Sequence, residues 1–463
     1  MEGRWARHAG AERVVVVGWD CASPWLALER WAGALPNLAR LRQGGAWGRL
    51  RSCDPPITVP AWMAMGAGAD PGALGVYGFR NRVRGGGPEA TRLTSREDFE
   101  LPPLWERLGS HGLRACAVGV PGTWPPRPML GKLIPGPETP PEAPKTWPPE
   151  LWGRVKALAP DYAFDVGEHR KVERGELVRR VRAMTEARFD VVEDLAQDDD
   201  WNLLWVVEIG LDRLHHALWA CVDPSHPRYE GPGSPWELAL LDYYKLLDAR
   251  LGRLWGLVDD GQTACLVVSD HGARPFVGGF RLNAWLIQEG LLVLKDDGAQ
   301  EGRWDGARID WSRTRAWAMA GYCGRVFLNL EGRDPGGIVA AHEAAPLLTR
   351  VQAGLEALRG PSGEPWRTRA LRSEALYEVA RGFAPDLTVY VDDLSWRCLD
   401  TLGGEGLYRA ENDTGPDTAN HDWDGILVAA GAGVSPCELR GARLVEVAGH
   451  IEALLGLSKA RRG

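Results

Sequence analysis

Several features are missing from this 463-residue sequence, and each absence excludes a class of protein. No apolar stretch approaches the roughly 20 residues of a transmembrane helix, so we expect no membrane association. The valine run at 14–17 is too short for the apolar segment of a secretory signal. The eight cysteines include no C-x-x-C pair, which favours a reduced compartment and a cytoplasmic protein. Basic residues are not in excess: the formal net charge of −8 argues against general nucleic-acid binding.

Short apolar runs recur along the chain and alternate with segments of helical periodicity. Buried parallel strands are typically such continuous apolar runs, so the alternation predicts an α/β fold with a mostly parallel central sheet flanked by helices. The predicted strands cover 14–19, 46–51, 115–120, 203–209, 265–269 and 426–430. The predicted helices cover a segment ending near 42, then 58–65, 102–108, 174–195, 238–258 and 445–455.

The same pass along the chain predicts its domain organisation. Residues 12–280 form the α/β core, which includes a segment rich in proline and glycine at 121–149 that we expect on the surface. Residues 281–415 form an inserted, smaller α+β cap with strand signals at 325–330 and 387–391. Residues 416–463 return the chain to the core.

Carboxylates and imidazoles follow several of the predicted strands, although they lie far apart in sequence. In α/β sheets, ligands bind at the carboxyl ends of the strands, so we expect these side chains to converge. Carboxylate oxygen and neutral imidazole are common ligands of zinc and related divalent ions. The pattern therefore predicts a metal site, interpreted as a site for two ions. The candidate ligands are Asp20, Asp212, His216, Asp270, His271 and His421.

Each candidate ligand also has a simpler interpretation. Asp20 could cap the helix that follows the first strand. Asp212 and His216 lie one helical turn apart, a spacing that is common by chance. His421 lies in the polar stretch 412–424. The Asp270–His271 pair is more specific, because two polar groups at the end of a buried strand require a partner.

Thr58 is a second kind of candidate functional residue: its hydroxyl precedes Pro60 at the start of a predicted helix. The simplest interpretation is an N-cap hydroxyl. A helix N-terminus also binds phosphate well, because its N–H groups are free and its dipole end is positive. Beside a metal ion, the hydroxyl could serve as a nucleophile on phosphorus. Arg274 and Arg325 are candidates for binding phosphate, although such arginines are more often salt-bridged or solvated.

Seven segments of the chain, taken in order, resemble the type I phosphodiesterase/nucleotide pyrophosphatase branch of the alkaline phosphatase superfamily. The resemblance extends from Val14 to Leu457. Its carriers are Gly18-Trp19-Asp20, Leu35-Pro36-Asn37-Leu38-Ala39-Arg40-Leu41, Pro55-Pro56-Ile57-Thr58-Val59-Pro60-Ala61-Trp62, Asp70-Pro71-Gly72 with Gly75-Val76-Tyr77-Gly78-Phe79, Asp212-Arg213-Leu214-His215-His216-Ala217-Leu218-Trp219, Ser269-Asp270-His271-Gly272 and His421-Asp422-Trp423-Asp424-Gly425.

The resemblance implies an alkaline-phosphatase-like fold and a di-metal hydrolase. Thr58 would attack phosphorus to form a phosphothreonine intermediate, which water then hydrolyses. Zinc is the implied metal, with manganese as the alternative. One ion would be held by Asp20, Thr58, Asp270 and His271, and the other by Asp212, His216 and His421.

The chain departs from the family's pattern at a few positions. Ala67 and Leu74 stand where the branch usually has threonine and often has histidine. The better-studied nucleotide pyrophosphatases hold a phosphate oxygen with an asparagine, and the aligned residue here is Phe79, with Asn81 as a nearby candidate. Sulfatases of the superfamily need cysteine or serine where this chain has Thr58, which argues against sulfate esters.

The expected activity is hydrolysis of phosphodiester or nucleotide pyrophosphate bonds in a small phosphorylated substrate, for example a nucleotide. A phosphomonoesterase or phosphonate hydrolase on the same di-metal scaffold is the nearest alternative. A metal-binding protein without catalysis is a further one, but it would be expected to lack a ligand or the nucleophile, and all seven positions are present. The sequence leaves the oligomeric state open.

Overall fold

The computed structural model describes residues 5–83, 85–296, 298 and 300–457, and the end of the predicted 416–463 segment lies outside them. A central eight-stranded sheet has the order β21-β2-β20-β8-β1-β7-β5-β6. Only β20 runs antiparallel to its neighbours, so the mostly parallel sheet is confirmed. The strands are β1 (Arg13–Trp19), β2 (Ala46–Arg51), β5 (Ala115–Val120), β6 (Gly131–Pro135), β7 (Leu203–Glu208), β8 (Thr263–Val268), β20 (Asp424–Gly431) and β21 (Cys437–Arg443).

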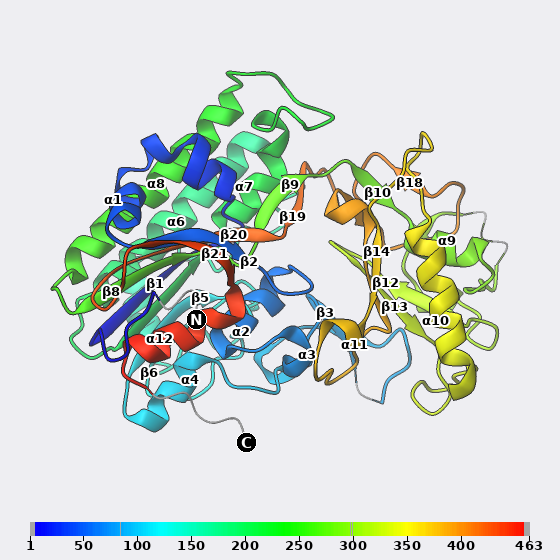
Figure 1. Cartoon of the computed structure of the whole chain (residues 1–463), viewed down its shortest axis with the longest axis horizontal. Coiled ribbons are helices and arrows are strands. Elements are labelled where there is room, and N and C mark those ends of the chain that lie inside the picture. The colour runs from blue at the N-terminus through cyan, green and yellow to red at the C-terminus, as the bar shows by residue number, and fades with distance from the viewer. Residues whose placement is uncertain (1–4, 84, 297, 299, 458–463) are drawn as a thin grey trace.

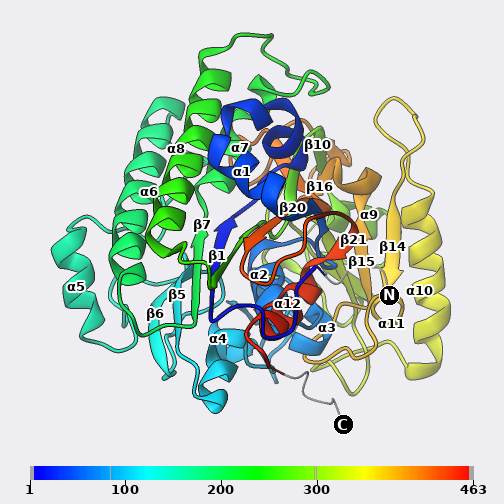
Figure 2. The ribbon, with the colours of Figure 1, turned by 60° about the vertical axis from the view of Figure 1, so that its left-hand side comes forward.

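Helices cover both faces of this sheet, because successive side chains of a buried strand point to opposite faces. In β1, Val15 and Val17 join one hydrophobic core, whereas Val14 and Val16 join the other. The first core is closed by α1 (Pro36–Gly44), α6 (Arg174–Ala196), α7 (Gly210–Leu218) and α8 (Pro235–Val258). The second core is closed by α2 (Thr58–Ala67), α4 (Leu104–Arg107) and α12 (Val447–Leu454). Figure 2 shows α6 and α8 side by side.

A smaller α+β lobe forms the cap beside the sheet domain (Figure 1). Its four-stranded antiparallel sheet has the order β12-β13-β15-β14 and packs with two helices around a separate core. The elements are β12 (Ala316–Met319), β13 (Gly324–Leu328), β14 (Arg369–Arg372), β15 (Leu387–Tyr390), α9 (Leu282–Gln288) and α10 (Ala341–Glu356).

Shorter elements complete the chain. In the sheet domain they are α3 (Pro71–Leu74), β3 (Arg80–Arg82), β4 (Thr91–Leu93) and α5 (Leu151–Leu158). In the cap they are β10 (Gly278–Phe280), β11 (Gly302–Arg303), α11 (Ser373–Leu376), β16 (Trp396–Cys398), β17 (Thr401–Leu402) and β18 (Tyr408–Arg409). Between the two lobes, β9 (Gly272–Pro275) pairs with β19 (Ala419–Asp422) (Figure 1).

Composition had indicated that the proline-rich segment 121–149 lies on the surface. The structure shows that part of this segment is buried. It contains β6, which pairs in parallel with β5 at the edge of the central sheet, and Leu133 and Ile134 are buried there. Pro135 is compatible with this strand because an edge strand tolerates a residue that cannot donate a ladder hydrogen bond. Composition alone therefore misplaced an element of the sheet.

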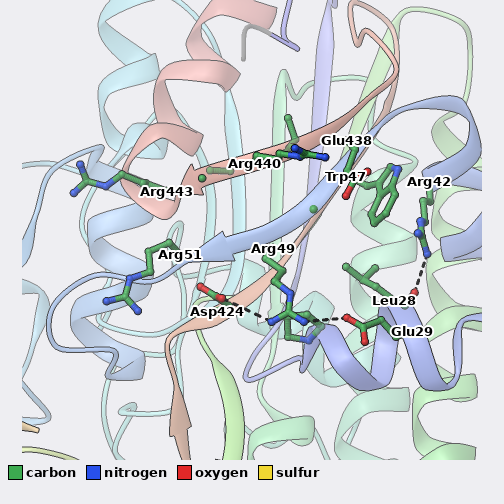
Figure 3. Close-up of a pocket in the computed structure, with 15 residues that line it drawn as sticks. Leu28, Glu29, Arg42, Trp47, Arg49, Arg51, Asp424, Glu438, Arg440 and Arg443 are labelled. Carbon is green, nitrogen blue, oxygen red and sulfur yellow. Dashed lines mark hydrogen bonds and ion pairs between the residues drawn. The ribbon is translucent and has the colours of Figure 1, made fainter. Parts of the chain in front are cut away.

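The outer strands β2 and β21 are not fully covered by helices, which leaves a groove of about 750 Å³ (Figure 3). Arg49 lies in this groove and forms ion pairs with Glu29 at 3.0 Å and Asp424 at 4.0 Å. The guanidinium of Arg42 stacks 3.4 Å from the ring centroid of Trp47. The groove is a basic surface feature on the sheet face, in a chain whose overall charge is negative.

All eight cysteines are free thiols, and seven of them are buried. No helix among the described residues combines the length and the apolar character that a membrane crossing requires.

Candidate active site

Seven polar side chains meet at the carboxyl edge of the central sheet. Asp20 follows β1, Asp270 and His271 follow β8, and α7 begins two residues after β7 and carries Asp212 and His216. The β19–β9 pairing places His421 opposite Ala273, and Thr58 is the first residue of α2. None of the seven side chains is more than 2% exposed. The fold thus brings together residues that are far apart in sequence, such as Asp20 and His421.

The first group surrounds the Nε2 atom of His271. This atom lies 3.2 Å from Thr58 Oγ1, 3.1 Å from Asp270 Oδ2 and 3.9 Å from Asp20 Oδ1. The other ring nitrogen, Nδ1, is directed at the carbonyl of Gly272 at 3.1 Å, so a neutral His271 keeps Nε2 free for a ligand.

The second group surrounds the Oδ1 atom of Asp212. His216 Nε2 lies 3.3 Å from this oxygen and His421 Nε2 lies 3.5 Å from it. The Nδ1 atoms are occupied elsewhere: that of His216 by Asp417 Oδ1 at 2.8 Å, and that of His421 by the carbonyl of Pro56 at 2.8 Å. These contacts orient both imidazoles with Nε2 toward the carboxylate.

Four buried atoms of the site have no hydrogen-bond partner: Asp20 Oδ1, Asp212 Oδ1, Asp270 Oδ2 and His421 Nε2. Unpaired buried polar atoms are costly and need an explanation. The ligand atoms of Asp212, His216 and His421 lie within 4.8 Å of one another, as do those of Asp20, Asp212 and His271. Two adjacent divalent cations fit these atoms, and Asp212 is close enough to contact both sites.

The charges of the site also fit cations. Burial, together with the nearby carboxylates of Asp270 and Asp212, raises the pKa of Asp20, and burial likewise raises the pKa of Asp270. Burial lowers the pKa of His421 to about 4, which keeps this imidazole neutral and available as a ligand. A bound cation would remove the repulsion between the carboxylates.

His216 differs from the other imidazoles. Burial lowers its pKa, but the surrounding groups, Asp417 first and then Tyr322 and Asp212, outweigh burial and raise the pKa to about 10. Without a cation this imidazole therefore holds a proton, and a metal ion must displace that proton to bind.

The N-cap interpretation of Thr58 is wrong. The N-cap of α2 is Ile57, whose backbone is extended at φ −121° and ψ 131° and whose side chain caps nothing. Thr58 is already helical, and its hydroxyl is directed at His271. The hydroxyl is therefore free for chemistry at the positive end of the helix.

Three further side chains hold two of the carboxylates and one imidazole in place, and reasoning from the sequence had missed them. Trp62 Nε1 donates to Asp20 Oδ2 at 2.7 Å, and Arg213 donates to Asp212 Oδ2 at 2.6 Å. Asp417 orients His216. In the sequence, these side chains could have been found only by their proximity to predicted site residues. Trp62 lies one helical turn after Thr58, and Arg213 follows Asp212.

The three predicted substrate contacts lie in other networks. Asn81 donates to Thr94 Oγ1 at 2.6 Å and accepts from the Tyr77 amide at 3.2 Å. Arg274 pairs with Asp393 at 3.5 Å and Asp422 at 3.6 Å, and Arg325 donates to the carbonyl of Arg80 at 2.9 Å. Among the hydrogen bonds and ion pairs of the described residues, none joins these three side chains to the seven buried ones.

Solved structures share this fold. A phosphonoacetate hydrolase from Sinorhizobium meliloti 1021, in complex with phosphonoformate, matches with a TM-score of 0.57 and 15% identity, over 97% of this chain and 96% of the other. Human ectonucleotide pyrophosphatase/phosphodiesterase 5 matches with a TM-score of 0.54 and 13% identity, over the same shares of each chain. These likenesses confirm the alkaline-phosphatase-like fold.

No curated protein matches the sequence. The sequence profile of the family "type I phosphodiesterase / nucleotide pyrophosphatase" matches residues 14–422, which is most of the chain. This chain therefore belongs to the type I phosphodiesterase/nucleotide pyrophosphatase family and is a hydrolase acting on phosphoric ester bonds.

Proposed function

We propose that the protein hydrolyses phosphodiester or nucleotide pyrophosphate bonds of a small substrate through a phosphothreonine intermediate on Thr58. The observation that carries the proposal is the position of the Thr58 hydroxyl, 3.2 Å from His271 Nε2 and beside buried carboxylate oxygens that lack a partner. A hydroxyl so placed, at the start of a helix, suits attack on phosphorus.

The side chains of the chain itself would perform distinct tasks. Asp20, Asp270 and His271 would hold one divalent ion with Thr58, and Asp212, His216 and His421 would hold the other. When bound, the two ions, which we propose to be zinc, supply the Lewis acidity that makes the hydroxyl nucleophilic and neutralises charge. Thr58 Oγ1 would form the bond to phosphorus as the leaving group departs. Free N–H groups in the first turn of α2 would orient the phosphoryl group.

Phosphonate hydrolysis is the second candidate, favoured by one observation. The Sinorhizobium meliloti structure of similar fold is named a phosphonoacetate hydrolase and contains phosphonoformate. Both candidates use the same nucleophile and cations, and they differ in the bond that breaks.

The test combines metal analysis with two chromogenic esters. We expect two bound ions per chain and faster hydrolysis of bis-p-nitrophenyl phosphate than of p-nitrophenyl phosphate. Thr58→Ala should reduce turnover by at least about 1,000-fold, since a nucleophile is lost. The variant should still fold, because a single hydrogen bond contributes only about 1 kcal/mol to the free energy of unfolding. Thr58→Ser, which keeps a hydroxyl, is the matched control.

The outcomes separate the candidates. Full activity of Thr58→Ala would refute the assignment of Thr58 as the nucleophile. Preference for the monoester would favour a phosphomonoesterase, and release of phosphate from phosphonoacetate with little diester cleavage would favour the phosphonate hydrolase. In addition, mass spectrometry of enzyme acid-quenched during turnover of bis-p-nitrophenyl phosphate should find a p-nitrophenyl phosphoryl group on the peptide that contains Thr58, because attack on a diester expels one ester group and leaves the other on phosphorus.

We also propose that the protein works in the cytoplasm. The support is its free cysteines, seven of which are buried, because a reducing compartment keeps such thiols unpaired. Fractionation of the source cells would test this location.

A further inference from the structure

Tyr322, a cap residue in the turn between β12 and β13, contacts two of the metal-binding side chains, His216 and His421. Its side chain is largely buried, with 7% of the residue exposed. The phenol ring stacks on the imidazole of His421, with 3.6 Å between ring centroids and an interplanar angle of 23°. This stacking places the phenol within the site, although the residue belongs to the other lobe.

The hydroxyl of Tyr322 lies on the ligand side of His216. Tyr322 Oη is 3.0 Å from His216 Nε2, the nitrogen that Asp417 leaves free by binding Nδ1. On its other side, Oη accepts a hydrogen bond from an Nη2–H of Arg170 at 3.1 Å. Because a guanidinium donor already occupies a lone pair of Oη, the phenolic proton is directed away from Arg170.

Two guanidinium groups hold this phenol in one orientation. Arg170 Nε donates to Asp417 Oδ2 at 2.9 Å, and Arg397 Nη1 donates to the same oxygen at 3.2 Å. The Arg397 guanidinium also lies 4.1 Å from the centroid of the Tyr322 ring. Two positive charges therefore face one carboxylate, and the excess favours an anionic oxygen beside Oη.

The neighbouring segment contains Phe79 and Asn81, from which the sequence had led us to expect a phosphate contact. Asn81, the nearest amide side chain expected to contact phosphate, is occupied by Thr94 and Tyr77. Phe79 packs its apolar ring against Tyr322, with 6.2 Å between centroids. The cap therefore provides a hydroxyl where this segment offers only a phenyl ring.

We propose that Tyr322 is a catalytic residue whose phenolic O–H, oriented by Arg170, donates a hydrogen bond to a non-bridging oxygen of the phosphoryl group during transfer. The inference rests on the proposed function. When His216 Nε2 binds a metal ion, that nitrogen no longer exchanges a hydrogen bond with the phenol hydroxyl. Phosphoryl oxygens are then the acceptors available to the phenolic proton. Phosphoryl transfer spreads charge over the non-bridging oxygens, and fixed donors in a buried site stabilise such charge strongly.

The test compares Tyr322→Phe with Tyr408→Phe, a matched cap variant whose hydroxyl bonds the carbonyl of Arg359 at 2.7 Å. Tyr322→Phe should lower kcat by about 100- to 1,000-fold, the usual effect of removing one transition-state donor. KM should change little, and both metal ions should remain bound. Tyr408→Phe should match the wild-type enzyme.

A second measurement does not depend on turnover. Binding of orthovanadate, which adopts the trigonal-bipyramidal geometry of the transition state, should weaken in Tyr322→Phe by a factor similar to the loss in kcat. Binding of inorganic phosphate should weaken much less. Arg170→Lys should show the same pattern to a smaller degree, because it keeps the charge and loses the planar guanidinium.

Each outcome decides between the two proposals. If Thr58→Ala is inactive while Tyr322→Phe keeps wild-type kcat and vanadate affinity, the role of Tyr322 is refuted and the proposed function stands. If Tyr322→Phe loses a metal ion, Tyr322 supports His216 instead of the substrate, and the inference is also refuted. If Thr58→Ala is active, the proposed function itself fails.

Discussion

Asp417 should control both the stability of the protein and its affinity for metal. This carboxylate is 1% exposed as a residue and accepts hydrogen bonds from His216 Nδ1 at 2.8 Å, Arg170 Nε at 2.9 Å and Arg397 Nη1 at 3.2 Å. Asp417→Asn preserves the shape of the side chain and removes its charge. The two guanidinium groups then lose their shared partner in a buried setting.

The magnitude follows from these contacts. Breaking a buried ion pair by removing one partner costs about 3–5 kcal/mol, which we expect as the loss in free energy of unfolding. A residue that orients a metal-binding histidine typically contributes about 10- to 100-fold in metal affinity. Asp417→Asn should therefore weaken zinc binding by that factor.

Urea denaturation of the metal-free protein measures the first effect, and competition with a chromophoric chelator measures the second. Glu411→Gln is the control, because Glu411 is exposed and pairs with Arg228 only at 3.4 Å. Such a surface ion pair contributes roughly 0–1 kcal/mol. If Asp417→Asn resembles this control in both measurements, Asp417 does not organise the site as we reason.

Three further predictions concern Glu138, the bound cations and Gly18. Burial raises the pKa of Glu138 to about 7, above its ordinary 4.5, so the folded protein binds this proton more tightly than the unfolded chain. The free energy of unfolding should therefore fall as pH rises from 4.5 to about 7, and urea titrations should find a smaller fall in Glu138→Gln. Chelation should lower Tm in differential scanning fluorimetry, because Asp20 and Asp270 would repel each other; an unchanged Tm would count against bound cations. Gly18→Ala should cost about 1–3 kcal/mol in urea unfolding, since its Cβ would lie 2.5 Å from the ring of Trp62; wild-type stability would contradict this tight packing.

Much of the fold was predictable because several of the buried strands, such as β1 and β5, have a continuous apolar run. The predicted strand at 14–19 corresponds to β1 (Arg13–Trp19), and that at 115–120 to β5 (Ala115–Val120). β6 was missed because its short apolar core, Leu133 and Ile134, lies among prolines and glycines, whose composition indicates a loop. Pairing with β5, a long-range contact, stabilises it as a strand.

For the candidate site, too, some features could be predicted from the sequence and others could not. The sequence by itself determined that Asp20, Asp270 and His271 share one edge, because each follows a strand of a parallel sheet and such strand ends converge. Only the tertiary structure decided that Thr58 directs its hydroxyl at His271 instead of capping α2. Only the tertiary structure, too, brought Tyr322 of the cap against His421. Strand ends are encoded by local apolar patterns, whereas contacts between lobes depend on packing between residues about 100 positions apart, which no local pattern records.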